Sequence, residues 1–284
     1  MGISNPKRSV LITGSSSGGM GSALAIAFHK AGFHVYATAR NPSKMTELAS
    51  LGIDTLELDI QSESSIADCV SKIPSLDILV NNAGHQFLMP IVDINIAEAR
   101  KAYDLNVWGH IAVIQAFLPL LLKSPNAVIV NQTSIGVNLA MPFQAVYNSS
   151  KAALAMLTDS LRLELQPFGI QVVDLRTGFV LTNIIKNQQD NNNPKLPKGS
   201  IYEPAKEVVE KALRQEEFKG KGMPAQQWAD LVVQDLQKSN PPAVIWRGES
   251  ASRVRDQTVL SSGLFDGEVK KMVGLDVVEQ LVKK

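Results

Sequence analysis

Two side chains four residues apart in this sequence could move a proton together. They are Tyr147 and Lys151, in the run Tyr-Asn-Ser-Ser-Lys, and residues four apart lie on one face of a helix. A tyrosine whose pKa is about 10 is a poor acid or base at neutral pH, but a neighbouring ammonium group favours its phenolate. The same spacing also arises by chance, so the elements around the pair decide whether it has a chemical role.

Asn106 and Ser134 are polar residues that the surrounding elements can bring to the same place. Ser134 follows an apolar run typical of a buried strand, and Asn106 lies within a helical pattern over 96–123. In a parallel sheet covered by helices, ligands bind outside the carboxyl ends of the strands. Both residues belong to elements that can converge on that edge.

A glycine-rich segment, Thr13–Gly21 (TGSSSGGMG), lies between an apolar run and an amphipathic stretch. Glycine allows the chain to turn tightly and to approach a pyrophosphate, whose charge is favoured at a helix N-terminus. An ordinary strand-to-helix turn is the alternative. Four glycines within eight residues in this context favour a nucleotide site, although the common G-x-G-x-x-G spacing is absent.

The residues after the second predicted strand indicate which nucleotide would bind. An NAD site usually has Asp or Glu here, which binds the ribose 2′-hydroxyl. The run Tyr36–Pro42 (YATARNP) contains no acid, and the first one downstream is Glu47. Arg40 instead offers a planar, permanently charged group that suits a 2′-phosphate. An exposed arginine at a strand end needs no ligand, yet the missing acid and the present base together favour NADP.

Apolar runs alternate with helical patterns through the first two thirds of the chain. Strands are predicted at 9–13, 33–38, 53–58, 76–80, 127–130, 170–175 and 243–246. Helices are predicted at 22–30, 42–50, 62–72, 96–123 with a break near Pro119, 150–165 and 224–236. This alternation predicts an α/β fold in one domain, 1–284, with a doubly wound parallel sheet of about seven strands in the order 3-2-1-4-5-6-7.

Composition narrows the classes of function. The 284 residues are 45% hydrophobic and 19% charged, which supports a sizeable core and excludes disorder as the main state. The net charge of +1 gives no electrostatic footprint for nucleic acid. The single cysteine, Cys69, excludes an internal disulfide, and the histidines lack a ligand spacing, so no metal is predicted. No apolar run reaches the roughly 18 residues of a membrane span or resembles a signal peptide, so a cytoplasmic location is expected.

Taken together, these motifs resemble those of the short-chain dehydrogenase/reductase family, over about residues 7–250. The family's glycine motif matches Thr13–Gly21, with a loop one residue longer, and its NNAG motif is Asn81–Gly84. Its proline-glycine turn is altered to Arg176–Thr182 (RTGFVLT). The resemblance implies that the catalytic residues are Asn106, Ser134, Tyr147 and Lys151. It implies contacts with the cofactor at Gly14, Ser16, Ser17, Gly18, Met20, Gly21, Arg40, Asp59, Ile60, Asn82, Ala83, Gly84, Tyr147, Lys151, Gly178, Val180 and Thr182.

Within the family, the fungal acyl-dihydroxyacetone-phosphate reductases are similar in several short runs. These runs are Val35–Arg40, Val107–His110, Met223–Ala225 and Trp246–Gly248. Such relatives carry an apolar segment near the C-terminus that suggests association with lipid, where this chain has Ser252–Gln257 (SRVRDQ). The difference argues against a lipid substrate and favours a soluble ketone or aldehyde.

The resemblance implies an NADPH-dependent oxidoreductase that reduces a small-to-medium, partly apolar ketone or aldehyde to an alcohol. Tyr147 would donate the proton and Ser134 would hold the carbonyl oxygen. Lys151 would lower the pKa of the tyrosine and bind the nicotinamide ribose, and Asn106 would anchor a water that links Lys151 to solvent. Two other classes stay open: a cofactor-assisted isomerase or cyclase, and a non-catalytic NADPH-binding scaffold. The resemblance also implies a homodimer or homotetramer packed through 96–123 and 150–165.

Several other features allow two interpretations. His85 either lines a pocket or is an ordinary loop residue. The same choice between pocket and core applies to Met141, Phe143, Phe179 and Trp228. The polar tract 186–200 is either a surface loop or a flap over a ligand, within a flexible substrate-loop region at about 183–225. A C-terminal extension is expected at about 250–284.

Overall fold

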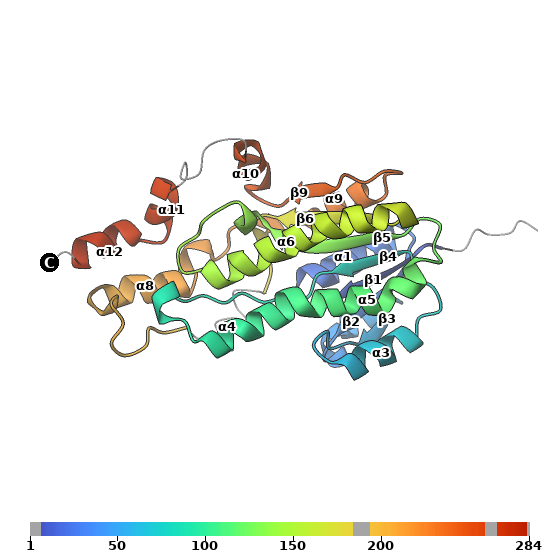
Figure 1. The fold of residues 1–284 in the computed structure, drawn as a ribbon, viewed down its shortest axis with the longest axis horizontal. Coiled ribbons are helices and arrows are strands. Elements are labelled where there is room, and N and C mark those ends of the chain that lie inside the picture. Colours follow the sequence, from blue (N-terminus) through green and yellow to red (C-terminus); the bar gives the residue numbers. More distant parts are fainter. Residues whose placement is uncertain (1–6, 184–193, 259–265, 283–284) are drawn as a thin grey trace, which may run out of the picture.

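The computed structural model describes residues 7–183, 194–258 and 266–282. Its main sheet has seven parallel strands in the order β3-β2-β1-β4-β5-β6-β9 (Figure 1). The strands are β1 (Ser9–Thr13), β2 (His34–Ala39), β3 (Asp54–Glu57), β4 (Ile78–Asn81), β5 (Val128–Ser134), β6 (Gln171–Thr177) and β9 (Val244–Arg247). The predicted doubly wound fold and its strand order are confirmed, with β9 as the seventh strand.

Helices cover both faces of this sheet, which is why its central strands are apolar on both sides. On one face, α1 and α9 pack on a core that includes the fully buried Trp228. On the other face, α3, α5 and α6 enclose a second core around Phe117, and Figure 1 shows α4, α5 and α6 together in front of the sheet. These helices are α1 (Met20–Lys30), α2 (Thr46–Ser50), α3 (Glu63–Ser71), α4 (Ile96–Tyr103), α5 (Gly109–Leu121), α6 (Ala145–Leu165) and α9 (Ala225–Leu236).

The long helical segment is interrupted at a different place from the one predicted. A π-helical turn, Asp104–Trp108, separates α4 from α5, whereas Pro119 lies inside α5. The predicted break near Pro119 is therefore wrong. A π turn inserts an extra residue and redirects side chains, and such turns are frequent at functional sites. Here the turn carries Asn106, which is buried.

The same helical segment, Ile96–Leu121, is long and apolar enough to cross a membrane by length and composition alone. Its most apolar window has a mean hydropathy of 1.2, and 44% of that window is buried inside the protein. The sequence prediction had counted only uninterrupted apolar runs and so missed this segment. Its packing against the sheet is that of a core helix.

Helix α6 begins at Ala145, five residues before the predicted start at 150. The run Tyr147–Ser150 has no apolar periodicity, so its helical state was invisible to pattern analysis. The earlier start places Tyr147 and Lys151 on one continuous helix, as their spacing required. Strand β9 also begins at Val244, one residue later than predicted.

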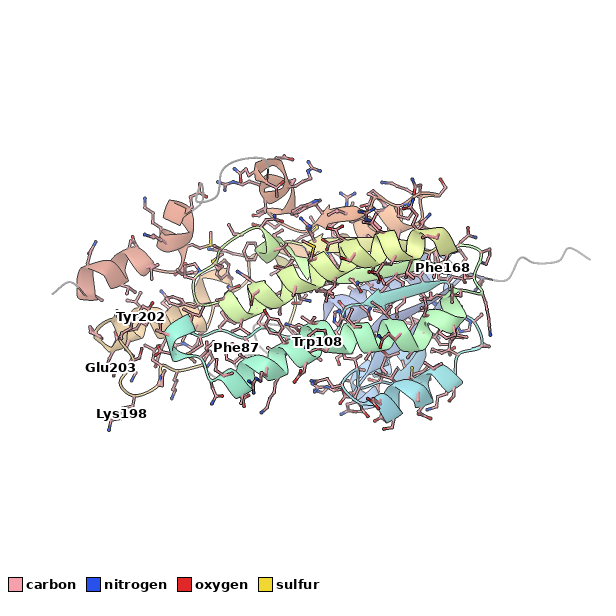
Figure 2. All side chains as sticks on the ribbon, in the orientation of Figure 1. Phe87, Trp108, Phe168, Lys198, Tyr202 and Glu203 are labelled. Carbon is pink, nitrogen blue, oxygen red and sulfur yellow. The ribbon has the colours of Figure 1, made fainter. Side chains whose placement is uncertain are left out.

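A third apolar cluster lies beyond the main sheet. It joins residues that follow β4 and β5, such as Leu88 and Met141, to α8 (Lys206–Leu213) and the C-terminal segment. Helices α11 (Asp266–Met272) and α12 (Leu275–Val282) lie at the same end as α8 (Figure 1), and α12 contacts α8. Figure 2 shows Lys198, Tyr202 and Glu203 at this end.

The remaining predicted segments lie partly outside the described residues. Of the polar tract 186–200, residues 186–193 lie outside them. In the described remainder, the Leu196 side chain is buried in the third cluster. Helix α10 (Ala251–Gln257) packs beside β9, and the short strands β7 (Val180–Leu181) and β8 (Met223–Pro224) form a separate parallel pair.

Candidate active site

A single cavity of about 1290 Å³ lies at the carboxyl ends of the central strands. Ser134, Tyr147 and Lys151 line it together with most of the residues that the sequence predicts to contact a cofactor. The predicted contacts among its lining residues are Gly14, Ser16, Ser17, Met20, Arg40, Asp59, Ile60, Asn82, Ala83, Gly84, Gly178, Val180 and Thr182. Gly18, Gly21 and Asn106 are not among the lining residues, and each has a different structural role.

The glycine-rich loop packs so closely that Gly21 leaves no room for a side chain, and a side chain on Gly18 would displace that of Asn183. A Cβ on Gly21 would lie 2.5 Å from the Gly14 carbonyl oxygen, and one on Gly18 would lie 2.1 Å from Asn183 Nδ2. Gly14 and Gly18 also adopt φ angles of 72° and 74°, in the left-handed region. Helix α1 follows with no side-chain cap and no acid in its first turn. Its free N–H groups and positive dipole end fit a pyrophosphate.

The Asn81–Gly84 loop is bonded to the glycine-rich loop. Asn82 Nδ2 donates to the carbonyls of Thr13 and Gly14, at 2.7 and 3.1 Å. Thr13 Oγ1 accepts from the N–H groups of Asn82 and Ala83, each at 2.9 Å. Buried His110 lies 2.7 Å from the Ala83 carbonyl, and burial lowers the pKa of this histidine to about 3. The neutral ring therefore donates from Nε2 and holds the loop from behind, a role that sequence analysis missed.

Asn106 holds the next part of this loop. Its Oδ1 accepts from His85 N at 3.1 Å, and its Nδ2 donates to the His85 carbonyl at 3.0 Å and to Ser150 Oγ at 3.1 Å. Both Nδ2 hydrogens are therefore bound by protein atoms. A Cβ on Gly84 would lie 3.1 Å from Asn106 Oδ1 and 3.5 Å from Lys151 Nζ, so this glycine allows the loop to pass close to the lysine.

Ser134, Tyr147 and Lys151 form the polar group at one part of the cavity. Ser134 is hydrogen-bonded to Tyr147, and Ser134 Oγ also accepts from Gly136 N at 3.0 Å. Burial raises the pKa of Tyr147 above its usual value, while the hydrogen bond to Ser134 opposes the rise. Lys151 Nζ donates to the Gln132 carbonyl at 2.8 Å, and burial lowers the pKa of this lysine to about 8.

These shifts correct one expectation about the tyrosine. Lys151 was expected to lower the pKa of Tyr147, but the direction in this structure is upward. The reason is that desolvation of the phenolate by burial is the largest effect, and the hydrogen bond to Ser134 opposes it only in part. Tyr147 is consequently a protonated phenol at neutral pH, which suits a proton donor.

Cations are numerous among the residues that line the cavity. The charged lining residues in the described chain are Arg40, Lys44, Lys101, Lys151, Lys221 and a single acid, Asp59. The Lys44 carbonyl accepts from both N and Oγ of Ser17, each at 2.9 Å, so the turn after β2 is tied to the glycine-rich loop. A cavity with this excess of cations fits an anionic dinucleotide. The sequence did not predict that Lys44 lines the cavity, because Lys44 belongs to none of the motifs.

The altered turn after β6 keeps its glycine for a packing reason. A Cβ on Gly178 would lie 2.1 Å from the Glu249 carbonyl oxygen, so the backbone here passes against the segment after β9. Thr177, where the family has proline, has a buried Oγ1 without a hydrogen-bond partner among the described residues. Further along, Asn183 N donates to the Gly18 carbonyl at 3.1 Å. This contact covers Gly18 and explains why it does not line the cavity.

Known proteins resemble this chain in both sequence and fold. The sequence pattern of the short chain dehydrogenases matches residues 8–193. The chain belongs to the short-chain dehydrogenase/reductase family. This short-chain dehydrogenase/reductase is 52% identical over 277 residues to one from Pestalotiopsis microspora, covering 98% of both chains. It is also 36% identical to the NADPH-dependent 1-acyldihydroxyacetone phosphate reductase of Schizosaccharomyces pombe, covering 94% of both. The expected similarity to that fungal group is confirmed.

Solved structures agree with the fold of this short-chain dehydrogenase/reductase. A short-chain dehydrogenase from Streptomyces avermitilis has a TM-score of 0.75 at 24% identity and covers 98% of both chains. A gluconate 5-dehydrogenase from Burkholderia cenocepacia, in complex with NADP and tartrate, has a TM-score of 0.59 at 27% identity. The match covers 65% of this chain and 76% of that one.

The residues with two interpretations divide between cavity and core. Phe179 lines the cavity, and Met141 belongs both to the cavity lining and to the third cluster. Phe143 and Trp228 are buried in apolar clusters and do not line the cavity. Half-buried His85 does line it, and burial, then Arg40 and Lys151, lowers its pKa. Gln215, Phe218 and Lys221 also line the cavity and lie within the substrate-loop region predicted at about 183–225, although no motif singled out these three residues.

Proposed function

We propose that this protein uses NADPH to reduce the carbonyl group of a small-to-medium, partly apolar ketone or aldehyde to an alcohol. The observation that carries the proposal is one continuous cavity with Ser134, Tyr147 and Lys151 in its wall and Arg40 at the end of β2. NADP is present in the related Burkholderia gluconate 5-dehydrogenase, and the Schizosaccharomyces relative is named NADPH-dependent. Both relatives support the choice of cofactor.

The residues would act on the carbonyl oxygen in the following way. Tyr147 keeps its proton near neutral pH and donates it to the oxygen as general acid. Ser134 Oγ accepts from Gly136 N and is hydrogen-bonded to Tyr147, and its O–H would turn to donate to the same carbonyl oxygen when substrate is bound. Lys151 binds the nicotinamide ribose and places a positive charge beside the reacting groups. Asn106 positions the loop that contacts Lys151 through Gly84. When bound, NADPH supplies the hydride.

Binding of the cofactor is divided among three parts of the chain. The glycine-rich loop and the N-terminus of α1 would hold the pyrophosphate. Arg40, with Lys44 beside it, would bind the 2′-phosphate, and Asp59 with Ile60 would contact the adenine. Thr182 and the turn at Gly178 would contact the nicotinamide end.

We also propose how copies of this chain assemble and which segments of the chain surround the substrate. Exposed apolar residues on α4 and α6 and at both ends of α5 favour a homodimer or homotetramer through these helices. The segment 183–225 would form the substrate loop and 250–284 an extension that packs on it through α12. Cys69 is buried, and its pKa is raised to about 11 by burial, which suits a cytoplasmic enzyme without disulfides.

The direct test is to incubate the purified protein with NADPH and a panel of ketones and aldehydes while absorbance of the cofactor is followed. We expect NADPH to be consumed with at least one partly apolar carbonyl compound, and more slowly with NADH. Tight binding of NADPH without consumption on any compound would favour the scaffold or the non-redox enzyme instead.

A further inference from the structure

Gln215 is a buried and strained residue in the wall of the cavity. Its φ of 54° lies in the left-handed region, which side chains other than glycine and asparagine rarely adopt. Only 5% of the residue is exposed, and its Oε1 has no hydrogen-bond partner among the described residues. A buried amide oxygen without a partner is unfavourable. The turn itself requires neither the strained backbone nor the unpartnered amide oxygen, because glycine would adopt this conformation without strain.

A chain of contacts connects the Gln215 turn to the segment that follows Ser134. The N–H of Phe218 donates to the Gln215 carbonyl at 3.0 Å, and the Phe218 ring stacks on Phe179 with centroids 5.0 Å apart. Phe179 in turn packs against a cluster that contains Ile135, which directly follows Ser134. The nucleotide end, with Asp59 and Arg40, is formed by other strands.

The wall around Gln215 selects for a particular kind of molecule. The stacked rings of Phe179 and Phe218 present flat apolar surface. Leu139 and Met141 add further apolar lining, and this wall includes no carboxylate from the described chain. The amide of Gln215 lies within this apolar surrounding and would orient a neutral polar group there.

We propose that Gln215 binds a hydroxyl group of the substrate, which is then a ketone or aldehyde with a flat, largely apolar skeleton and a hydroxyl remote from the carbonyl. The inference rests on the proposed carbonyl reduction and specifies its substrate class. A substrate hydroxyl would donate to the buried Oε1, which has no other partner among the described residues. An analogue without the hydroxyl leaves the amide unpaired and binds less well.

The test compares α-tetralone with its ring-hydroxylated derivatives, which differ only in the group proposed to reach Gln215. Calorimetry with NADP⁺ present measures binding to the wild type, to Gln215→Leu and to Gln215→Gly. Leucine keeps the volume and removes the amide, and glycine also relieves the backbone. We expect at least one hydroxylated derivative to bind the wild type about tenfold or more tightly than α-tetralone. In both variants this ratio should fall close to one.

Two results would overturn the inference: a wild-type protein that binds every derivative no better than α-tetralone, or a preference that survives in both variants. If Gln215→Leu does not fold, Gln215→Gly carries the comparison, because glycine adopts the left-handed conformation freely. Consumption of NADPH with the same compounds is recorded separately. Binding discrimination without consumption would support the role of Gln215 and count against carbonyl reduction, so the two proposals fail independently.

Discussion

Tyr147 carries the chemical step in the proposed mechanism, and Tyr147→Phe removes only its hydroxyl. We expect turnover to fall by at least about a hundredfold, the lower end of what acid–base catalysis contributes, while NADPH still binds. Steady-state rates and a fluorescence titration with NADPH measure the two quantities. Near-normal turnover in this variant would exclude the tyrosine as proton donor.

We propose that Arg40 selects NADPH over NADH. Arg40→Ala should weaken NADPH by about ten- to a hundredfold relative to NADH, because a charge-assisted hydrogen bond of roughly 1.5–3 kcal/mol is lost only for the 2′-phosphate. Dissociation constants for both cofactors measure the effect. Lys101→Ala is the matched control, since it removes another cation of the same cavity. Equal losses for NADPH and NADH in Arg40→Ala would mean that the arginine has another role.

Lys151 links the rate to pH. Burial lowers its pKa to about 8, and the charge of Asp174 opposes that shift. A lowered pKa means that the ammonium group is lost sooner as pH rises, so kcat/KM for reduction should decline above about pH 8. Asp174→Asn removes the opposing charge and should move the decline to lower pH. A pH–rate profile of both proteins tests this, and an inflection that stays in place would contradict the coupling.

At the scale of elements, an ion pair within β6 is the centre of a network that reaches the loop after β5 and the Trp246 ring on β9. Arg176 Nε donates to Asp174 Oδ2 at 2.7 Å, and its guanidinium group also donates to Asn138 Oδ1 at 2.9 Å. The guanidinium carbon lies 5.0 Å from the centre of the Trp246 ring. This network holds the segment that follows Ser134, so it connects strand packing to the catalytic serine.

Arg176→Leu should therefore destabilise the protein strongly. The Asp174 side chain is 1% exposed and would lose its cation, and removal of one partner of a buried pair costs about 3–5 kcal/mol. Urea unfolding of the protein without cofactor measures the change. The double variant Asp174→Asn with Arg176→Leu should recover part of the loss. A change in the free energy of unfolding below about 0.5 kcal/mol in the single variant would show that the pair is structurally unimportant.

At the scale of the whole molecule, α4, the π turn after it and α6 form a face with exposed apolar side chains. Trp108 is 58% exposed and Met156 is 68% exposed. Trp108 also lines a groove of about 530 Å³, whose other lining residues lie within 91–104 and 145–149. Figure 2 shows Trp108 beside the junction of α4 and α5. A second copy of this chain, placed on the same face, would bury these side chains.

Trp108→Glu should convert the proposed dimer to a monomer, because it places a charge in the centre of that face. Sedimentation at micromolar concentration measures the state of the wild type and the variant. Lys72→Glu, on the exposed side of α3, serves as a control for the change of charge. A wild type that sediments as a monomer would contradict the proposed assembly.

Local patterns in the sequence were sufficient for the sheet and for most of the site. Buried β-branched runs, the glycine-rich segment and the spacing of Tyr147 and Lys151 each depend on neighbouring residues, so they can be identified along the chain. The doubly wound order follows from their alternation. The start of α6 and the π turn at Asp104–Trp108 were not predicted, because packing rather than periodicity determines them.

Only the tertiary structure decided the environment of each side chain. The upward shift in the pKa of Tyr147 comes from burial by residues distant in sequence, and Asn106 acts through contacts with His85 and Ser150. Gln215 became a candidate for binding the substrate only because its segment folds back over the sheet edge and lies beside Phe179. The sequence by itself determined which residue types were present and which strands carried them, because strand formation depends on the propensities of neighbouring residues. Desolvation and long-range contact determined what each residue can do, and those exist only once the chain is folded.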